Sequence, residues 1–179
     1  MLAQKSRSPG VRSERAPRTT NYQCAHEGRG GGVKRVELDP EAFRWAERNS
    51  HTRQGAGDNA ITLHLGAVEG CLPDLDGTVD LVISNPPYVP WADRDRMEPE
   101  VLDHDPSRAV FADDDGLAVI RQIEQAARRL LRPGGVVVVE HADSQGSSAP
   151  GVFGDGWSDV QDHVGLTGRD RFGTARWTA

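Results

Sequence analysis

The sequence predicts a doubly wound α/β fold built on a mostly parallel sheet. Apolar segments of strand length alternate with amphipathic segments of helix length, an order typical of βαβ units. The runs VDLVIS and VVVVE are almost continuously apolar, as expected for strands buried on both faces. A chain of 179 residues allows one ordinary domain with a proper core.

The folded domain is predicted to begin at Val33. Residues 1–32 are rich in Arg, Ser, Pro and Gly, and show neither a strand nor a helix period. Such a segment cannot bury enough apolar surface to offset the entropy of ordering. We therefore divide the chain into a disordered or non-homologous segment, 1–32, and a folded domain, 33–179. The glycine run at 28–32 has no strand before it or helix after it, so we interpret it as a linker.

The first half of the domain is predicted to contain, in order, a strand, a helix, a loop and a strand, at 33–38, 41–50, 51–59 and 61–65. Pro40 suits the first turn of the helix because its missing N–H is not needed there. Asp39 is a plausible N-cap, since its carboxylate can accept from the first free N–H groups.

The second half is predicted to begin with a strand at 79–84, followed by a long polar stretch at 89–115 that suggests a functional loop. An amphipathic helix then places Leu117, Ile120 and Ile123 on one face, and Pro133 with two glycines stops it. The remaining predicted elements are a buried strand, a weaker helix and two strands, at 136–141, 145–153, 157–160 and 171–177.

The composition excludes several functional classes. The net charge is −6 and the positive charge gathers at the N-terminus, which argues against direct nucleic-acid binding by the acidic body. Cys24 and Cys71 lack metal-ligand spacing. No apolar stretch approaches the roughly 20 residues that span a bilayer, and no secretory signal is present. We expect a cytoplasmic protein without a metal or a membrane partner.

The residues Asn85, Pro86, Pro87 and Tyr88 end a buried strand, where doubly wound sheets bind ligands. The two prolines fix the backbone and leave the Pro86 carbonyl to accept a bond from a ligand. Asn85 can donate and accept, and Tyr88 offers an aromatic face. These groups suit a planar carboxamide or an aromatic amine, whose two N–H groups need two acceptors. The alternative is a rigid turn that only ends the strand.

Glu37 ends the first strand of the domain, where a carboxylate can accept both hydroxyls of a ribose. The alternative is an ordinary solvated glutamate at a helix start. Asp39 competes for the same role, although its N-cap position explains it better. His141 ends another strand, and a lone histidine there is interpreted as structural.

The motifs VELDPEAFRWAERN, DLVISNPPYVP, EPEVLDHDPSRAVFADDDGLAVI and LLRPGGVVVVEH, with QG shortly after, carry a family resemblance. Together they resemble the bacterial protein-(glutamine-N5) methyltransferases that modify peptide chain release factors, from about Val33 to the C-terminus. NPPY alone is shared with DNA adenine and some ribosomal RNA methyltransferases, whereas the EPEV…DDGL block is more specific. The resemblance implies a Rossmann-like, S-adenosylmethionine-dependent catalytic domain at 33–179.

The resemblance also implies residue roles. Glu37 would bind the cofactor ribose, Asn85 would help bind both cofactor and substrate, and Pro86, Pro87 and Tyr88 would frame the substrate side chain. The implied substrate is the glutamine of the Gly-Gly-Gln loop of a release factor, with catalysis mainly by positioning and without a metal. Two alternatives stay open: an adenine-N6 or guanine-N2 nucleic-acid methyltransferase, and a catalytically inactive remnant of the family.

The sequence departs from the family in two places. The family has a strand and a glycine-rich loop about twenty residues before the Glu37 position, but this chain has Arg15 to Thr20 there. It also lacks the acidic residue that the family commonly carries at 66–68, near the adenine. We therefore expect a truncated or frameshifted copy, a sheet that lacks its first strand, and weak or absent cofactor binding.

Overall fold

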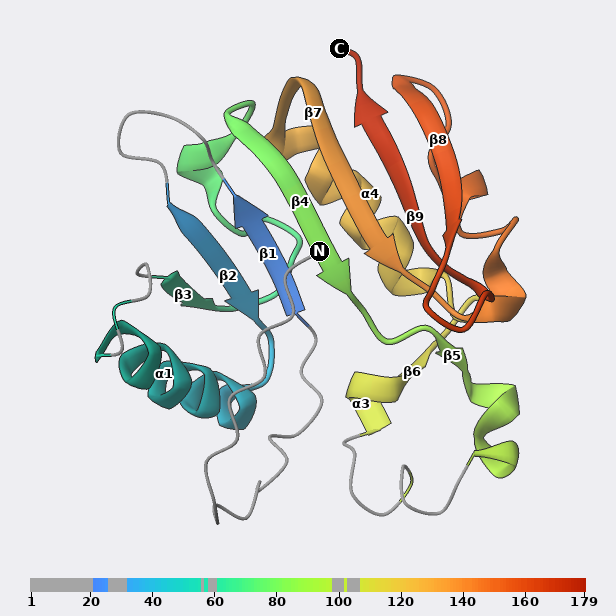
Figure 1. Cartoon of the computed structure of the whole chain (residues 1–179), viewed down its shortest axis with the longest axis horizontal. Helices are drawn as coiled ribbons and strands as arrows, with labels where there is room; N and C mark the ends of the chain where they lie inside the picture. Colours follow the sequence, from blue (N-terminus) through green and yellow to red (C-terminus); the bar gives the residue numbers. More distant parts are fainter. Residues whose placement is uncertain (1–20, 26–31, 56, 58–60, 98–101, 103–106) are drawn as a thin grey trace.

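The computed structural model describes residues 21–25, 32–55, 57, 61–97, 102 and 107–179. A seven-stranded sheet in the order β3-β2-β1-β4-β7-β9-β8 forms the body of the molecule (Figure 1). Its strands are β1 (Asn21–Ala25), β2 (Val33–Glu37), β3 (Ile61–Leu65), β4 (Val79–Asn85), β7 (Leu131–Glu140), β8 (Trp157–Val164) and β9 (Asp170–Trp177). The α-helices are α1 (Pro40–Gly55), α3 (Ser107–Val110) and α4 (Ala118–Leu130).

The strand directions confirm the predicted α/β class. β2 is parallel to β3, and β4 is parallel to β7. β9 runs antiparallel to both β7 and β8, and β1 runs antiparallel to both β2 and β4. The sheet is therefore mixed, which corrects the expectation of a mostly parallel sheet. The carboxyl ends of β2, β3, β4 and β7 therefore lie along one edge of the sheet, at the bottom of Figure 1.

The expected gap between β2 and β4 is filled, which corrects the prediction that the sheet lacks a strand there. β1 lies between them and runs antiparallel to both, with Tyr22 opposite Val36 on one side and Ser84 on the other. Open edges of β2 and β4 would leave rows of N–H and C=O groups unpaired, so even a segment without an apolar pattern can gain by pairing. Residues 1–20 and 26–31, including most of the glycine run, lie outside the described residues.

Helix α1 begins as predicted. The Asp39 carboxylate accepts bonds from the backbone N–H groups of Glu41 (2.7 Å) and Ala42 (3.0 Å), which confirms the N-cap. The helix continues to Gly55, so the loop predicted from residue 51 begins later. The segment 51–55 contains no proline, and its arginine and glutamine favour continuation of the helix.

The core lies between α4 and one face of the sheet. Ile120, Ile123 and Leu130 of α4 are almost completely buried, in agreement with the predicted apolar stripe. The helix ends before Pro133, as predicted. β7 begins directly after it, and its pairing with β4 shifts register across the Pro-Gly-Gly segment.

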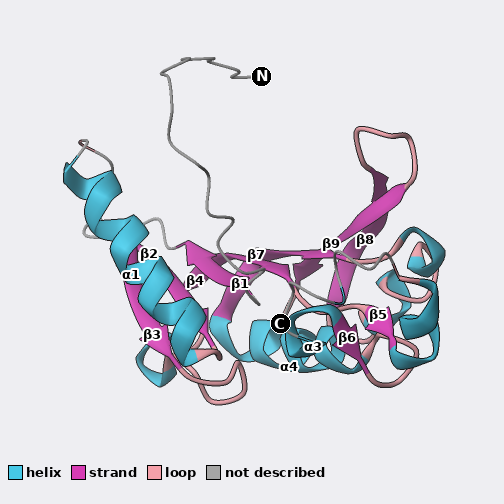
Figure 2. Cartoon of the chain, turned by 90° about the horizontal axis from the view of Figure 1, so that it is seen from below, coloured by secondary structure: helices cyan, strands magenta, loops and turns pink. Residues whose placement is uncertain are grey.

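The opposite face of the central strands is open. Along β7, Val137 and Val139 are almost completely buried, whereas Val136 and Val138 are only half-buried. On β4, Ile83 exposes 39% of its surface on the same open side. Figure 2 shows α4 on one side of the sheet and no described helix over β4, β7 and β9 on the other side. Burial on both faces, predicted from the continuous apolar runs, is therefore wrong for the described part of the chain.

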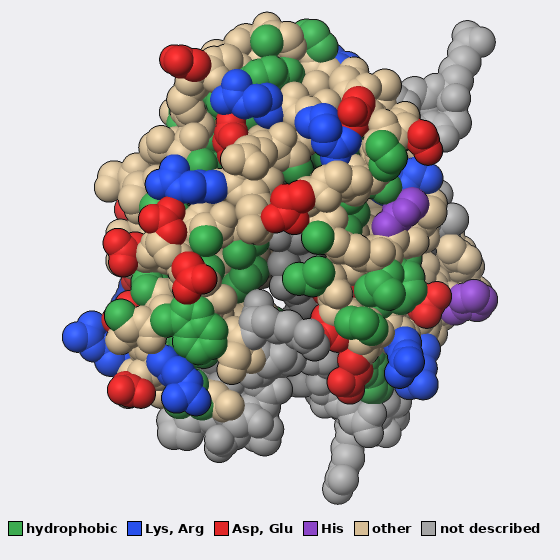
Figure 3. Space-filling view, turned by 180° about the vertical axis from the view of Figure 1, so that it is seen from behind, with side chains coloured by type: hydrophobic (Ala, Val, Ile, Leu, Met, Phe, Trp, Pro, Cys, Tyr) green, Lys and Arg blue, Asp and Glu red, His purple; other side chains and the backbone are tan. Residues whose placement is uncertain are grey.

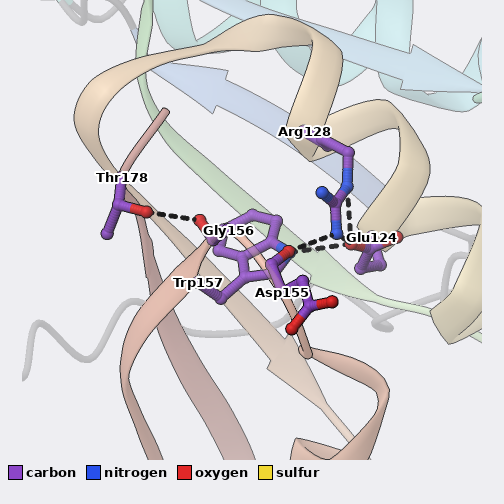
Figure 4. A network of polar contacts seen from close by, with 6 residues as sticks. All are labelled: Glu124, Arg128, Asp155, Gly156, Trp157 and Thr178. Carbon is purple, nitrogen blue, oxygen red and sulfur yellow. Dashed lines mark hydrogen bonds and ion pairs between the residues drawn. The ribbon is translucent and has the colours of Figure 1, made fainter.

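The C-terminal region is a long hairpin. β8 and β9 match the two predicted strands, but the helix predicted at 145–153 consists of two short 3-10 turns, Asp143–Gln145 (η3) and Pro150–Val152 (η4). Figure 4 shows how the hairpin is joined to α4 by polar contacts. Glu124 accepts bonds from Trp157 Nε1 (2.7 Å) and from Arg128, which also donates to the Asp155 carbonyl (2.9 Å).

The segment 89–115, predicted to be a functional loop, contains short elements: β5 (Val89–Pro90), a 3-10 turn (η2, Trp91–Arg96), α3 and β6 (Phe111–Ala112). β5 and β6 pair in parallel, and Trp91 stacks on Phe111 with ring centroids 4.8 Å apart. Residues 98–101 and 103–106, part of the segment that carries the family resemblance, lie outside the described residues. Within the described residues, no helix has the length and apolarity needed to cross a bilayer.

Candidate active site

The turn Asn85–Tyr88 lies at the carboxyl edge of the sheet, directly after β4. Asn85 is exposed, Pro86 and Pro87 are buried, and Tyr88 is half-buried. Among the described residues, no backbone N–H donates to the Pro86 carbonyl. The turn therefore combines an anchored backbone with an exposed amide side chain.

The Tyr88 side chain is held by the neighbouring strands. Its hydroxyl donates to the Glu140 carboxylate at the end of β7 (3.2 Å), and Arg171 of β9 donates to the same carboxylate (2.5 Å). The Arg171 guanidinium also lies over the Tyr88 ring, 5.5 Å from its centroid. Burial raises the pKa of Tyr88, while Arg171 lowers it and Glu140 raises it further. The phenol is therefore a neutral, fixed group.

Gln145 connects three segments behind the turn. Its side-chain nitrogen donates to the carbonyls of Tyr88 (3.1 Å) and Asp115 (2.8 Å), and its oxygen accepts from the N–H of Ala142 (2.9 Å). Only 4% of the residue is exposed. No role for Gln145 was predicted from the sequence, in which the QG pair is the available signal.

Two glycines allow these segments to approach one another. Gly116 has φ +84°, and a Cβ there would collide with the Tyr88 carbonyl oxygen and the Gln145 amide. A Cβ on Gly146 would collide with the Asp170 carboxylate of β9. The DDG and QG segments therefore fit closely against the turn and against β9.

Glu37 is enclosed rather than solvated. It exposes 1% of its surface, so the interpretation as an ordinary solvated glutamate is wrong. Its Oε1 accepts from the N–H of Asp39 (3.0 Å), and its Oε2 lies 3.6 Å from the Arg35 guanidinium. Burial lowers the pKa of Arg35, and Glu37 opposes that shift. A buried carboxylate at the end of β2 is a fixed acceptor.

Two exposed apolar side chains lie at the strand ends next to Glu37. Leu38 and Leu65, at the ends of β2 and β3, expose 50% and 53% of their surfaces. A pocket of about 300 Å³ opens beside Leu65, between the end of β3 and the segment 66–72, and Glu69 contributes to its lining. Positions 66–68 carry no acidic residue, and Glu69 follows at the next position along the chain.

The carboxyl edge can be compared with the groups of S-adenosylmethionine. Glu37 is the candidate acceptor for the ribose hydroxyls by its position at the end of β2, although its side chain is almost completely enclosed, and the exposed Leu38 and Leu65 offer apolar surface to a flat base. β1 ends at the opposite, amino edge, since Ala25 pairs with Val33 at the start of β2. The described residues therefore offer no glycine-rich loop at the carboxyl edge for the methionine end.

His141 has a structural environment, in line with its interpretation from the sequence. It is completely buried, and its ring nitrogens lie 2.8 Å from the Ala142 carbonyl and from an Asp162 carboxylate oxygen. A search of the described residues found no group of three or more His, Cys, Asp or Glu residues that could hold a metal ion.

Comparisons with known proteins identify relatives. No protein-family model matches the chain. The release factor glutamine methyltransferase of Streptomyces coelicolor is 49% identical over 146 residues, covering 80% of this chain and 50% of that protein. The protein of the same name from Mycolicibacterium smegmatis is 44% identical, covering 78% and 48%. The 4-amino-L-phenylalanine/4-methylamino-L-phenylalanine methyltransferase of Streptomyces pristinaespiralis is 44% identical, covering 66% and 38%.

Solved structures of methyltransferases share the fold. A predicted O-methyltransferase from Agrobacterium tumefaciens has a TM-score of 0.55 at 14% identity, covering 80% of this chain and 61% of that one. A methyltransferase from Pyrococcus furiosus has a TM-score of 0.54 at 20% identity, with the same coverage. These likenesses confirm the Rossmann-like fold. By sequence, the chain is similar to these bacterial release factor glutamine methyltransferases, and it spans about half the length of the curated relatives it matches.

Proposed function

We propose that this chain carries the methyl-transfer site of an S-adenosylmethionine-dependent methyltransferase. Its acceptor would be the side-chain amide nitrogen of the glutamine in the Gly-Gly-Gln loop of a peptide chain release factor. The observation that carries the proposal is the Asn85–Tyr88 turn, anchored from behind with its amide exposed at the carboxyl edge. The names of the relatives from S. coelicolor and M. smegmatis support this substrate.

In this proposal the turn binds a carboxamide by its two N–H groups. The Asn85 side-chain oxygen accepts one and the Pro86 carbonyl accepts the other. Arg171 lies over the Tyr88 ring, so a flat amide would stack on the other face of the ring. An amide nitrogen is a poor nucleophile because its lone pair is delocalised, so holding and aiming it is the main contribution that these residues can make.

The donor site would be formed by residues at the ends of β2 and β3. Glu37 would accept the ribose hydroxyls, and Leu38 and Leu65 would contact the base. The bound cofactor supplies an electrophilic methyl group on a sulfonium. Neither the Asn85 amide nor the Pro86 carbonyl is a base, so the proton lost from nitrogen would pass to solvent.

Two other acceptors are weaker candidates. The relative from S. pristinaespiralis is named for an aromatic amine, a group that the same pair of acceptors could hold. A nucleic-acid substrate is opposed by the net charge of −6. It is also opposed by the face shown in Figure 3, where cationic and anionic side chains are mixed and form no continuous basic surface.

The test is transfer of a labelled methyl group from S-adenosylmethionine to a purified release factor. The matched control is a release factor whose loop carries Gly-Gly-Ala, and 4-amino-L-phenylalanine and DNA serve as competing acceptors. We expect label in the Gly-Gly-Gln protein alone. Label in the amine or in the DNA would show that the acceptor is an aromatic amine or a nucleic-acid base and not the glutamine amide. No label from a chain that is folded by circular dichroism would favour the inactive remnant.

A further inference from the structure

We propose that Gln145 is a positioning residue for the Asn85–Tyr88 turn. Its side chain would set the place of the Tyr88 carbonyl and, through it, the direction in which the turn presents its two acceptors. The proposal rests on the function proposed above, because it concerns the orientation of the same substrate amide.

The Gln145 side chain bonds to the turn and to two further backbone groups. Its amide nitrogen divides its two N–H groups between the carbonyls of Tyr88 and Asp115, 3.1 and 2.8 Å away. Its oxygen is fixed in turn by the N–H of Ala142, two residues beyond the end of β7. The position of the Gln145 amide is therefore fixed relative to the sheet and not relative to a surface loop.

The chemistry requires an amide at this position. Both targets of the side-chain nitrogen are carbonyl oxygens, which can only accept, so only a group with two N–H donors satisfies both. The Ala142 N–H needs an acceptor from the same side chain. Among the short planar side chains, the glutamine amide alone offers two donors and an acceptor with this reach.

Contacts on two sides of Tyr88 restrict the position of the turn. Gly116 brings the backbone so close to the Tyr88 carbonyl that a Cβ would collide with it. On the far side the Tyr88 hydroxyl is held by Glu140. With the tyrosine fixed at its carbonyl and at its hydroxyl, the Pro86 carbonyl and the Asn85 side chain, which precede it, have a defined direction.

The test compares Gln145→Glu and Gln145→Met with wild type in methyl transfer to the release factor. The glutamate replaces the two donors by a carboxylate facing two carbonyls, and the methionine removes the donors at similar length. We expect kcat to fall by about 100-fold for Gln145→Glu and less for Gln145→Met. The KM for the release factor should change by no more than about twofold. The exposed Gln161→Glu on β8 makes the same chemical change and should leave both constants at the wild-type value.

A second readout does not depend on activity. The chain has two tyrosines, so in a Tyr22→Phe background Tyr88 is the only one left. With labelled tyrosine, nuclear magnetic resonance should show a contact between the Tyr88 ring and Arg171 that is lost in both Gln145 variants and kept in Gln161→Glu. Folded Gln145 variants with an unchanged Tyr88 signal and unchanged kcat would overturn the proposal. A wild-type chain that transfers no methyl group while its Tyr88 signal depends on Gln145 would count against the proposed function and leave the positioning role standing.

Discussion

Asn85 is exposed, whereas the two prolines that follow it are buried. We therefore expect Asn85 to be the residue of the turn that contacts the substrate amide. In Asn85→Ala the acceptor for one substrate N–H disappears while the prolines and Tyr88 keep their places. We expect kcat/KM for the release factor to fall by about 100-fold with little change in thermal stability. The exposed Asn49→Ala on α1 is the matched control. An Asn85→Ala chain with wild-type kcat/KM would remove the turn from the mechanism.

Tyr88 offers a test of the site's electrostatics. Glu140 accepts from its hydroxyl and adds a negative charge nearby, and both effects disfavour the phenolate and raise the pKa. In Glu140→Gln the charge is removed, so the pKa of Tyr88 should fall. Tyrosinate absorbance in the Tyr22→Phe background measures it directly. Asp143→Asn, an exposed carboxylate paired with Arg169, should leave it unchanged.

At this scale the sequence predicts the proposed contact residues, whereas the side chains that hold them in place are seen only in the structure. Asn85 and Tyr88 were predictable because Asn-Pro-Pro-Tyr directly follows a strand of continuous apolar character. The contacts of Gln145 were not, because they join it to Tyr88 and Asp115, which are distant in the sequence, and the short QG pair does not reveal them.

Among the elements, the union of α4 with the β8–β9 hairpin is the most localised. The Trp157 indole donates to Glu124, which is 8% exposed and is also held by Arg128 (Figure 4). In Trp157→Phe the ring is largely kept but the donor is lost, and Arg128 still compensates the carboxylate. We expect the free energy of unfolding to fall by about 1–2 kcal/mol in urea denaturation.

The control for this variant is Trp45→Phe on α1, where the half-buried indole has its ring face near Arg48. We expect Trp45→Phe to lower the free energy of unfolding by less than Trp157→Phe does. Equal losses would mean that ring size, and not the bond to Glu124, determines the effect.

Elements with strong local signals were predictable from the sequence. The apolar stripe of α4 and the N-cap of α1 are local sequence patterns, so both helices could be predicted from their own residues. β1 could not be foreseen, because its pairing depends on the open edges of β2 and β4 and not on any pattern of its own. The two 3-10 turns at 143–152 likewise replace a helix that was predicted from a weak period.

For the molecule as a whole, the uneven covering of the sheet has a measurable consequence. Val137 and Val138 are adjacent and identical, but Val137 is completely buried against the α4 side and Val138 lies half-buried on the open face. Val137→Ala should lower the free energy of unfolding by about 2–3 kcal/mol. Val138→Ala should lower it by about 1 kcal/mol. Equal losses in chemical denaturation would show that the second face is covered as well.

The direction of β1 governs what the carboxyl edge can hold. β1 completes the sheet, yet it ends at the amino edge, where Ala25 pairs with Val33, away from Glu37 and Asn85. In the proposed donor site, the described part of the edge would contact the nucleoside end of the methyl donor and would give the methionine end few contacts. Methyl transfer depends on this binding step, because without a bound methyl donor the turn can only hold the acceptor amide.

The most direct test is a calorimetric titration of the chain with S-adenosylmethionine and, separately, with 5′-methylthioadenosine, which keeps the nucleoside and lacks the amino acid end. We predict one-site binding of both with affinities within about twofold of each other, and loss of both in Glu37→Gln. Binding of S-adenosylmethionine about tenfold tighter than the shortened compound, or no binding of either by the folded chain, would contradict this account of the site.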